Sequence, residues 1–159
     1  MRILTFLLFL FASLSTYAQS VDISEITQKA KKGDAEAQYT LGRYYDKGLE
    51  GVIKIDKKEA LKWFKKSAIR GNPKAQRYIG EYKELGLGGL EKDARIAREW
   101  YEKAAPELKK MAEKGDVEAQ YHLGLCYKYG NGITKSTNET LKCFQKAAVQ
   151  GDADAQFNL

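Results

Sequence analysis

Apolar residues recur at fixed places in successive segments of the chain. One aliphatic position returns four times, at Leu41, Ile79, Leu123 and Leu159. An aromatic position returns three times, in the pairs Trp63-Phe64, Trp100-Tyr101 and Cys143-Phe144. The polar-small pair Ala-Gln precedes each aliphatic position, at 37–38, 75–76, 119–120 and 155–156. A pattern that repeats every 36–44 residues predicts a solenoid of stacked units.

The 14 glycines follow the same period and divide into sets with different roles. Two sets are predicted to end helices, where glycine tolerates the left-handed conformation. They are Gly33, Gly71, Gly115 and Gly151, and Gly48, Gly86 and Gly130. The set Gly42, Gly80 and Gly124 falls within a helix, where glycine costs roughly 1 kcal/mol against alanine. We therefore expect the paired helix to approach closely there, with the small residues Ala60, Ala97 and Thr140 opposite.

Each unit is predicted to be a helix, a turn and a second helix. The first helices are expected over 34–47, 73–85 and 117–129, and the second helices over 57–70, 94–105 and 137–150. Asp56, Asp93 and Ser136 are predicted N-caps of the second helices. A further helix over 21–32 is expected to cover the first unit. The chain is thus predicted to be all-α.

The second unit is longer than the others. Asp93 lies 22 residues before Gly115, whereas Asp56 lies 15 residues before Gly71. The insertion contains Pro106, which is costly inside a helix but tolerated in a first turn. Residues 107–114 are expected to form either a separate short helix or a kinked extension of the preceding one. Two sub-arrays, 21–105 and 106–159, would then meet with a change of superhelix direction.

The N-terminal segment has the composition of an export signal. Arg2 precedes an apolar run from Ile3 to Leu14, and Ala18 offers a small residue for cleavage. The run of about 12 residues is shorter than the roughly 20 that span a bilayer. We expect a signal peptide over 1–18, followed by a capping segment over 19–32. The mature protein is expected to be secreted or periplasmic, or in the endoplasmic reticulum lumen of a eukaryote.

Groups suited to catalysis are few in this sequence. His122 is the one histidine, and because its counterparts in other units vary, we expect it to be exposed. The patterns CxxC, HExxH, GxSxG and the P-loop do not occur. We expect no enzyme activity, cofactor or metal. The net charge of +6 becomes 6 − 1 = +5 when Arg2 is removed, and the basic residues are interpreted as a solvated outer surface. Neither nucleic acid nor stable membrane insertion after signal removal is expected.

The two cysteines, Cys126 and Cys143, fall on the two antiparallel helices of one unit. Their positions are about one helical turn out of register, which is near enough for contact without ensuring it. An oxidising compartment would permit a disulfide between them. The alternative is a pair of buried free thiols that act as small hydrophobic residues.

The sequence resembles a known repeat family. The run Gly-Asp-Ala-Glu-Ala-Gln-Tyr-x-Leu-Gly at 33–42, followed by Trp-Phe-x-x-x-Ala at 63–68, is similar to the Sel-one-like repeat, a branch of the tetratricopeptide-repeat superfamily. The resemblance implies a right-handed α-solenoid of helix-turn-helix repeats over 33–70, 71–114 and 115–150, with a partial repeat over 151–159. It implies an exported adaptor or scaffold that binds another protein or a peptide.

The resemblance also implies a concave face formed by the first helix of each repeat. Tyrosine beside arginine is the composition expected of interaction hot spots. The positions carried over by phase are Glu36, Tyr39, Arg43, Asp46, Lys74, Arg77, Glu81, Glu84, Glu118, Tyr121, Leu125 and Lys128. For Tyr39 and Tyr121, packing between neighbouring repeats is an equal alternative.

Two further expectations concern function and the C-terminal end. Some cysteine-rich secreted relatives have been discussed as hydrolases, so the alternative function is a cell-wall hydrolase or a β-lactam-acting enzyme. Those relatives carry cysteines at the positions of Ala148 and Gln156, which this chain lacks.

The partial repeat is expected to rest on residues 137–150 and to bury Phe157 and Leu159. Either the chain is a fragment of a longer array, or its end is covered by a partner or a second copy.

Overall fold

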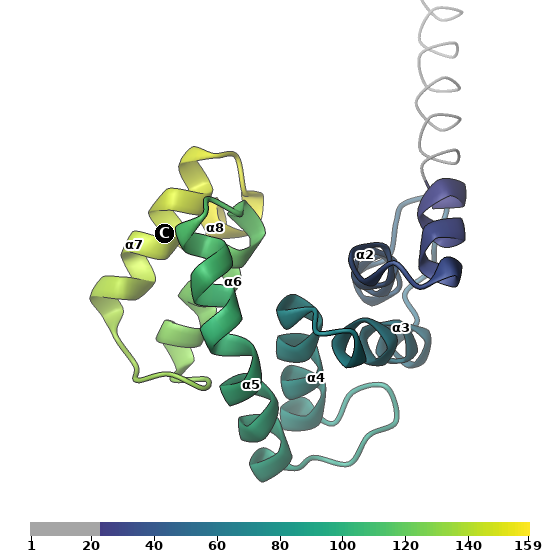
Figure 1. Cartoon of the computed structure of the whole chain (residues 1–159), viewed down its shortest axis with the longest axis horizontal. Coiled ribbons are helices and arrows are strands. Elements are labelled where there is room, and N and C mark those ends of the chain that lie inside the picture. The colour runs from purple at the N-terminus through teal and green to yellow at the C-terminus, as the bar shows by residue number, and fades with distance from the viewer. Residues whose placement is uncertain (1–22) are drawn as a thin grey trace, which may run out of the picture.

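The computed structural model describes residues 23–159, so the signal peptide expected over 1–18 lies outside the described residues. A helix over 23–32 precedes seven further helices within the described part of the chain (Figure 1). They are α2 (Ala35–Lys47), α3 (Lys57–Ile69), α4 (Pro73–Leu85), α5 (Ala94–Glu113), α6 (Val117–Tyr129), α7 (Thr137–Val149) and α8 (Ala153–Phe157). Each helix packs mainly against its neighbours in sequence, which confirms the predicted all-α solenoid.

The helix starts lie where the capping residues predict them. The Asp56 side chain accepts hydrogen bonds from the backbone N–H groups of Lys58 and Glu59, at 2.9 and 3.0 Å. Asp93 and Ser136 cap α5 and α7 in the same way, as expected. The first helices have caps too, and these were not among the predicted N-caps. These caps are Asp34, Asn72, Asp116 and Asp152.

The insertion in the second repeat extends α5 rather than forming a separate helix. α5 runs without interruption from Ala94 to Glu113, and Pro106 lies inside it with its side chain exposed. The C-terminal half of α5 buries Leu108 and Ala112 in a cluster with α6 and α7. In Figure 1, α2–α4 lie on one side of α5 and α6–α8 lie on the other. The long helix therefore joins two groups of helices through packing at both of its ends.

The glycines inside helices mark places where the paired helix comes close, as predicted. A Cβ atom added to Gly42, Gly80 or Gly124 would lie 2.7, 2.6 or 2.5 Å from a ring atom. The rings belong to Phe64, Tyr101 and Phe144, each on the second helix of the same repeat. The nearest atoms at all three glycines belong to an aromatic ring, which fills the space left by the missing side chain. At Gly80 the carbonyl oxygen of Ala97, one of the small residues expected opposite, also lies 3.1 Å from the added Cβ.

The recurring Ala-Gln pair links each repeat to the helix before it. The Gln38 amide donates a hydrogen bond to the backbone carbonyl of Ala30, eight residues earlier, at 2.9 Å. Gln76, Gln120 and Gln156 donate equivalent bonds at 3.2, 3.2 and 3.1 Å to Ala68, Ala112 and Ala148. The alanine of each pair is buried, so one residue packs the junction while the next bonds across it.

The final helix differs from expectation. α8 does rest on α7, because Ala155 is buried in a cluster with Phe144 and Ala147. Phe157, however, is 91 % exposed and Leu159 is 57 % exposed. At 100° per residue, Phe157 lies about 200° around the helix from Ala155 and faces away from α7. The expected burial of these two side chains is therefore wrong.

Candidate binding surface on the inner helices

Charged side chains from three repeats meet where α2, α4 and α6 face one another. We call these three helices, the first of each repeat, the inner helices. Glu118 accepts hydrogen bonds from the Tyr39 hydroxyl at 2.9 Å and the Lys74 ammonium at 3.1 Å, and it also pairs with Arg43. Lys74 in turn donates to Glu36 at 2.6 Å. We call this set the inter-repeat network; its members are Glu36, Tyr39, Arg43, Lys74, Glu118 and His122. It fixes the first repeat against the third, with the second between them.

His122 belongs to this network, and the expectation that it would be exposed is wrong. Its side chain is 1 % exposed, and its Nε2 lies 2.9 Å from the Tyr39 hydroxyl. Because that hydroxyl gives its proton to Glu118, Nε2 carries the hydrogen and donates to the tyrosine. Burial lowers the pKa of His122 well below its usual value, and the positive charge of Arg77 lowers it further. The histidine is therefore neutral and structural.

Several residues expected on the binding face are also withdrawn from solvent. Tyr39, Lys74 and Arg77 are buried, and Asp46 is nearly so. Tyr39 packs between repeats, which was the alternative left open for it, with Tyr78 and His122 as ring neighbours. The physical reason is curvature, since residues at one phase of successive inner helices contact one another instead of a partner. Those buried side chains shape the surface without offering contacts.

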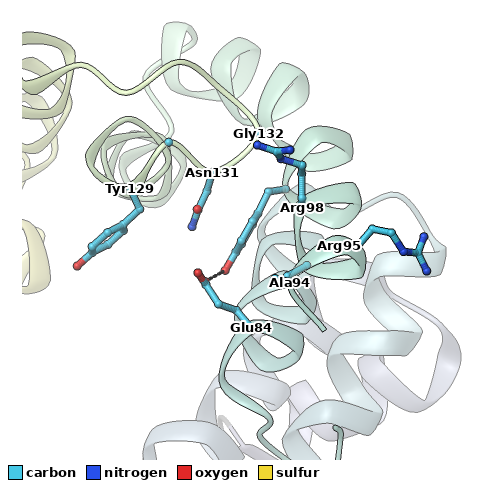
Figure 2. A pocket seen from close by; sticks show the side chains of 10 residues that line it. Glu84, Ala94, Arg95, Arg98, Tyr129, Asn131 and Gly132 are labelled. Atoms are coloured by element: carbon cyan, nitrogen blue, oxygen red, sulfur yellow. Dashed lines mark hydrogen bonds between the residues drawn. The ribbon is translucent and has the colours of Figure 1, made fainter. Parts of the chain in front are cut away.

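Beside the network the inner helices part around a cavity of about 480 Å³. We call it the inner groove. Its charged lining residues are Asp46, Lys47, Arg77, Glu81, Glu84 and Asp154. The remaining lining residues are Tyr78, Tyr101, Tyr121, Tyr129, Leu85, Leu125, Asn131 and Asn158. A second cavity of about 450 Å³ adjoins it along α5 and shares Glu84, Tyr101, Tyr129 and Asn131 (Figure 2).

Most charges in the inner groove are already paired. Lys47 pairs with Asp154 at 2.5 Å, and Arg77 pairs with Glu81 at 2.8 Å. Glu84 differs, because among the described residues it accepts only the Tyr101 hydroxyl, at 2.6 Å (Figure 2). Burial raises the pKa of Tyr101, and the hydrogen bond to Glu84 raises it further, so the tyrosine remains a donor. Glu84 thus keeps a negative charge without a cation, where the two cavities meet.

The expected binding-face residues divide between the two features. Asp46, Arg77, Glu81, Glu84, Tyr121 and Leu125 line the inner groove, and the other expected residues belong to the network, except Lys128. Lys128 donates to the Asn158 side chain at 2.9 Å. Sequence reasoning missed eight lining residues, namely Lys47, Tyr78, Leu85, Tyr101, Tyr129, Asn131, Asp154 and Asn158. The positions carried over from the family cover one face of α2, α4 and α6, so they leave out residues on other faces, at helix ends, on α5, in α8 or in a loop.

Cys126 and Cys143 are both free thiols in the structure. They lie in one buried cluster with Leu108 and Leu123. Burial raises the pKa of the Cys126 thiol to about 11, so the reactive thiolate is scarce near neutral pH. Of the two alternatives, the structure has the buried free thiols and not the disulfide.

Residues 23–159 contain neither a cluster of metal-ligating side chains nor a helix that could span a membrane. Within that range, the structure has no group of three or more His, Cys, Asp or Glu side chains placed to hold a metal ion. Among the helices of the same range, none combines the length and the apolar character needed to cross a membrane.

Comparison with known proteins finds one repeat family three times along the chain. The Sel1 repeat matches residues 35–72, 73–105 and 117–152. A curated relative is the chitin synthase regulator SKT5 of Saccharomyces cerevisiae, 38 % identical over 93 residues. That alignment covers 58 % of this chain and 13 % of the relative. Another is HRD3B of Arabidopsis thaliana, an ERAD-associated E3 ubiquitin-protein ligase component, 30 % identical over 72 % of this chain and 16 % of the relative.

A solved structure shows the same architecture. A protective antigen present in uropathogenic Escherichia coli strains, whose crystal structure displays an SLR fold, is 30 % identical with a TM-score of 0.50. The match covers 86 % of this chain and 35 % of that chain. This chain therefore spans only a small part of the curated relatives that it matches, and about a third of the antigen.

Proposed function

We propose that this chain, which belongs to the Sel1 repeat family, acts as an exported adaptor or scaffold and holds another protein or a peptide in its inner groove. Members of the family serve largely as non-catalytic adaptors in protein–protein interactions, and the relatives named above are described as a regulator and as a ligase component. The fold suits this role because a curved array of helices offers an extended inner surface.

The observation that carries the proposal is the exposure of apolar and aromatic side chains inside the inner groove. Leu85 is 50 % exposed and Tyr129 is 62 % exposed, whereas the neighbouring tyrosines of the inner helices are largely covered. Tyrosine at the edge of a hollow provides contact area together with a polar tip, which is typical of protein interfaces. The alternative hydrolase function is not favoured, because His122 lies in the inter-repeat network and outside the groove.

A photo-cross-linking residue tests this proposal. Placed at Leu85, it faces the inner groove; placed at Ile69, which is 80 % exposed on α3, it serves as a matched control outside the groove. In the fraction that contains the exported protein, we expect cross-links to another polypeptide from position 85 and not from position 69. Equal cross-linking from both positions, or none from position 85, would contradict the proposal.

Export is the second part of the proposal and rests on the sequence of the N-terminal segment. The charge at Arg2, the apolar run and Ala18 fit signal-peptidase processing. We expect the exported protein to begin at Gln19. Mass spectrometry of the protein isolated outside the cytoplasm checks this, and an intact Met1 would reject it.

A further inference from the structure

We infer that the inner groove recognises an extended protein segment through a lysine or arginine side chain, whose cation pairs with Glu84. This inference rests on the proposed adaptor function and adds the chemistry of the partner. It follows from the charge of the groove, from the side chains around Glu84 and from the state of the neighbouring cations.

The charge balance of the groove points to a cationic partner. Its lining carries four carboxylates, Asp46, Glu81, Glu84 and Asp154, against the two cations Lys47 and Arg77. Both cations are held by carboxylates of the groove, and Asp46 pairs with Lys57 at 2.7 Å. Glu84 is left with only a neutral hydroxyl as partner among the described residues. The groove is therefore negative in a chain whose net charge is +6.

The side chains near Glu84 suit the rest of a basic residue. Leu85 and Tyr129 expose apolar surface on which the methylene stem of lysine or arginine can pack. One face of the Tyr129 ring is already covered by the Lys128 ammonium, 5.6 Å from the ring centroid, so the ring contributes through its exposed apolar surface. Figure 2 shows Asn131 beside Tyr129, with its side chain pointing toward Glu84. Its side-chain amide, unpaired within the described part of the chain, offers a donor and an acceptor to a peptide backbone.

The arginines nearby are poorly placed to attract an acidic segment instead. Arg77 is buried and held by Glu81. In the adjoining cavity, Arg95 pairs with Glu99 at 2.6 Å and Arg98 lies 3.9 Å from Glu102, and both arginines point away from Glu84 (Figure 2). Opposite charges steer encounter and reject wrong partners, so an unpaired carboxylate in this place selects for a cation.

Three peptide libraries test the inference. Each contains peptides of nine residues with blocked ends and with random uncharged residues around one fixed central residue. The central residue is lysine in the first library, glutamine in the second and glutamate in the third. We expect the chain to bind the lysine library about threefold to fivefold more tightly than the glutamine library, as for a partly exposed ion pair. Fluorescence polarisation at low and high salt measures this, and high salt should reduce the difference.

Variants assign the preference to Glu84. Glu84→Gln should bind the lysine and glutamine libraries equally, and Glu84→Lys should prefer the glutamate library. Glu91→Gln removes a carboxylate that is exposed on the loop before α5, outside both cavities, and should leave the preference unchanged.

The inference is overturned if the wild-type chain binds the lysine and glutamine libraries equally, or if Glu84→Gln keeps the preference. It is also overturned if no library binds. In each case, cross-linking from position 85 shows whether the adaptor function itself survives, because that readout does not depend on the charge of the partner.

Discussion

Tyr39 connects an acceptor and a donor that belong to another repeat. Its hydroxyl donates to Glu118 and lies 2.9 Å from Nε2 of His122, with residues 79 and 83 positions away in sequence as partners. Among the described residues, Nε2 of His122 has the Tyr39 hydroxyl as its one partner, whereas Glu118 also pairs with Arg43 and Lys74. Removal of the Tyr39 hydroxyl therefore leaves the buried Nε2 without a hydrogen bond.

The variant Tyr39→Phe should lower the free energy of unfolding by about 1–3 kcal/mol, since it leaves the buried Nε2 of His122 unsatisfied. Tyr127→Phe is the matched control, because Tyr127 is half-buried and its hydroxyl makes no hydrogen bond within residues 23–159. Urea denaturation of both variants measures the difference. Equal losses would show that the hydroxyl of Tyr39 adds nothing beyond its ring.

His122 should also make stability depend on pH. Burial, with help from Arg77, lowers its pKa in the folded chain well below the value of about 6.5 in the unfolded chain. Above pH 6.5 the group is neutral in both states and contributes nothing. As pH falls below 6.5 the unfolded chain takes up a proton that the folded chain does not, so stability is lost by about 1.4 kcal/mol per pH unit.

The comparison with His122→Gln isolates this contribution, because the chain has one histidine. Between pH 6.5 and 5, the wild-type free energy of unfolding should fall more steeply than that of the variant. Parallel slopes would mean that the histidine is protonated in the folded chain.

The surroundings of His122 could not be predicted from sequence. Its counterparts Thr40, Tyr78 and Asn158 differ in chemistry, and such variation usually indicates a solvent-facing position. Burial at this position depends on which side chain lies across the inner surface, and Tyr39 is 83 residues away. A pattern within one repeat does not contain that information. Glu84, in contrast, was expected on the inner surface, because the family resemblance assigns that surface to the first helices and helix phase then includes position 84.

At the scale of the helix, the sequence predicts where a helix begins, because that depends on neighbouring residues. It does not predict whether a helix continues past a proline, because that depends on packing against other helices. The N-caps Asp56, Asp93 and Ser136 were predictable because the cap bonds to residues two or three positions ahead. The course of α5 through Pro106 was not predictable. A proline favours a break, but the burial of Leu108 and Ala112 against α6 favours continuation, and the packing prevails.

The variant Pro106→Ala should raise the free energy of unfolding by about 2 kcal/mol. Proline inside a helix costs about 3 kcal/mol through a lost hydrogen bond and a clash, and loss of its rigidity in the unfolded chain returns up to about 1 kcal/mol. Thermal unfolding followed by circular dichroism measures the gain. Since Pro106 is exposed, no packing is removed, and a destabilised variant would show that α5 needs its proline.

Gly124→Ala should have the opposite sign. Alanine normally stabilises a helix interior by about 1 kcal/mol, but here its Cβ would lie 2.5 Å from the Phe144 ring, and overpacking costs about 1–3 kcal/mol. We expect a net loss of about 1 kcal/mol in denaturant unfolding. The same substitution in a Phe144→Leu background should cost less, because the smaller side chain gives way. A gain in the wild-type background would refute the close approach.

At the scale of the molecule, the inter-repeat network joins the three repeats to one another. Glu118 bonds to the first and second repeats at once, through Tyr39, Arg43 and Lys74. The groups of helices on either side of α5 therefore hold their positions through side chains as well as through α5 itself. The extent of this closure is a property of the assembled array and has no signature within a single repeat.

The variant Glu118→Ala should let the first and third repeats move apart. It leaves Arg43 without its carboxylate partner, and it removes one of the carboxylate partners of Lys74. We expect a larger radius of gyration in small-angle scattering and a loss of about 2–4 kcal/mol in unfolding free energy. Glu59→Ala, which removes an exposed pair with Lys62 on α3, should change neither quantity measurably. An unchanged radius for Glu118→Ala would show that backbone packing alone sets the curvature.

The glutamine bonds between repeats have a consequence for how such a chain changes length. Each of these bonds joins a glutamine amide to a carbonyl eight residues earlier, so donor and acceptor lie on opposite sides of one boundary between units. A duplication that begins and ends at equivalent glycines copies one donor together with one acceptor. The new junction is then complete when it forms, and no existing bond loses its partner. A gene that encodes this array can grow or shrink by whole units without passing through a poorly joined intermediate.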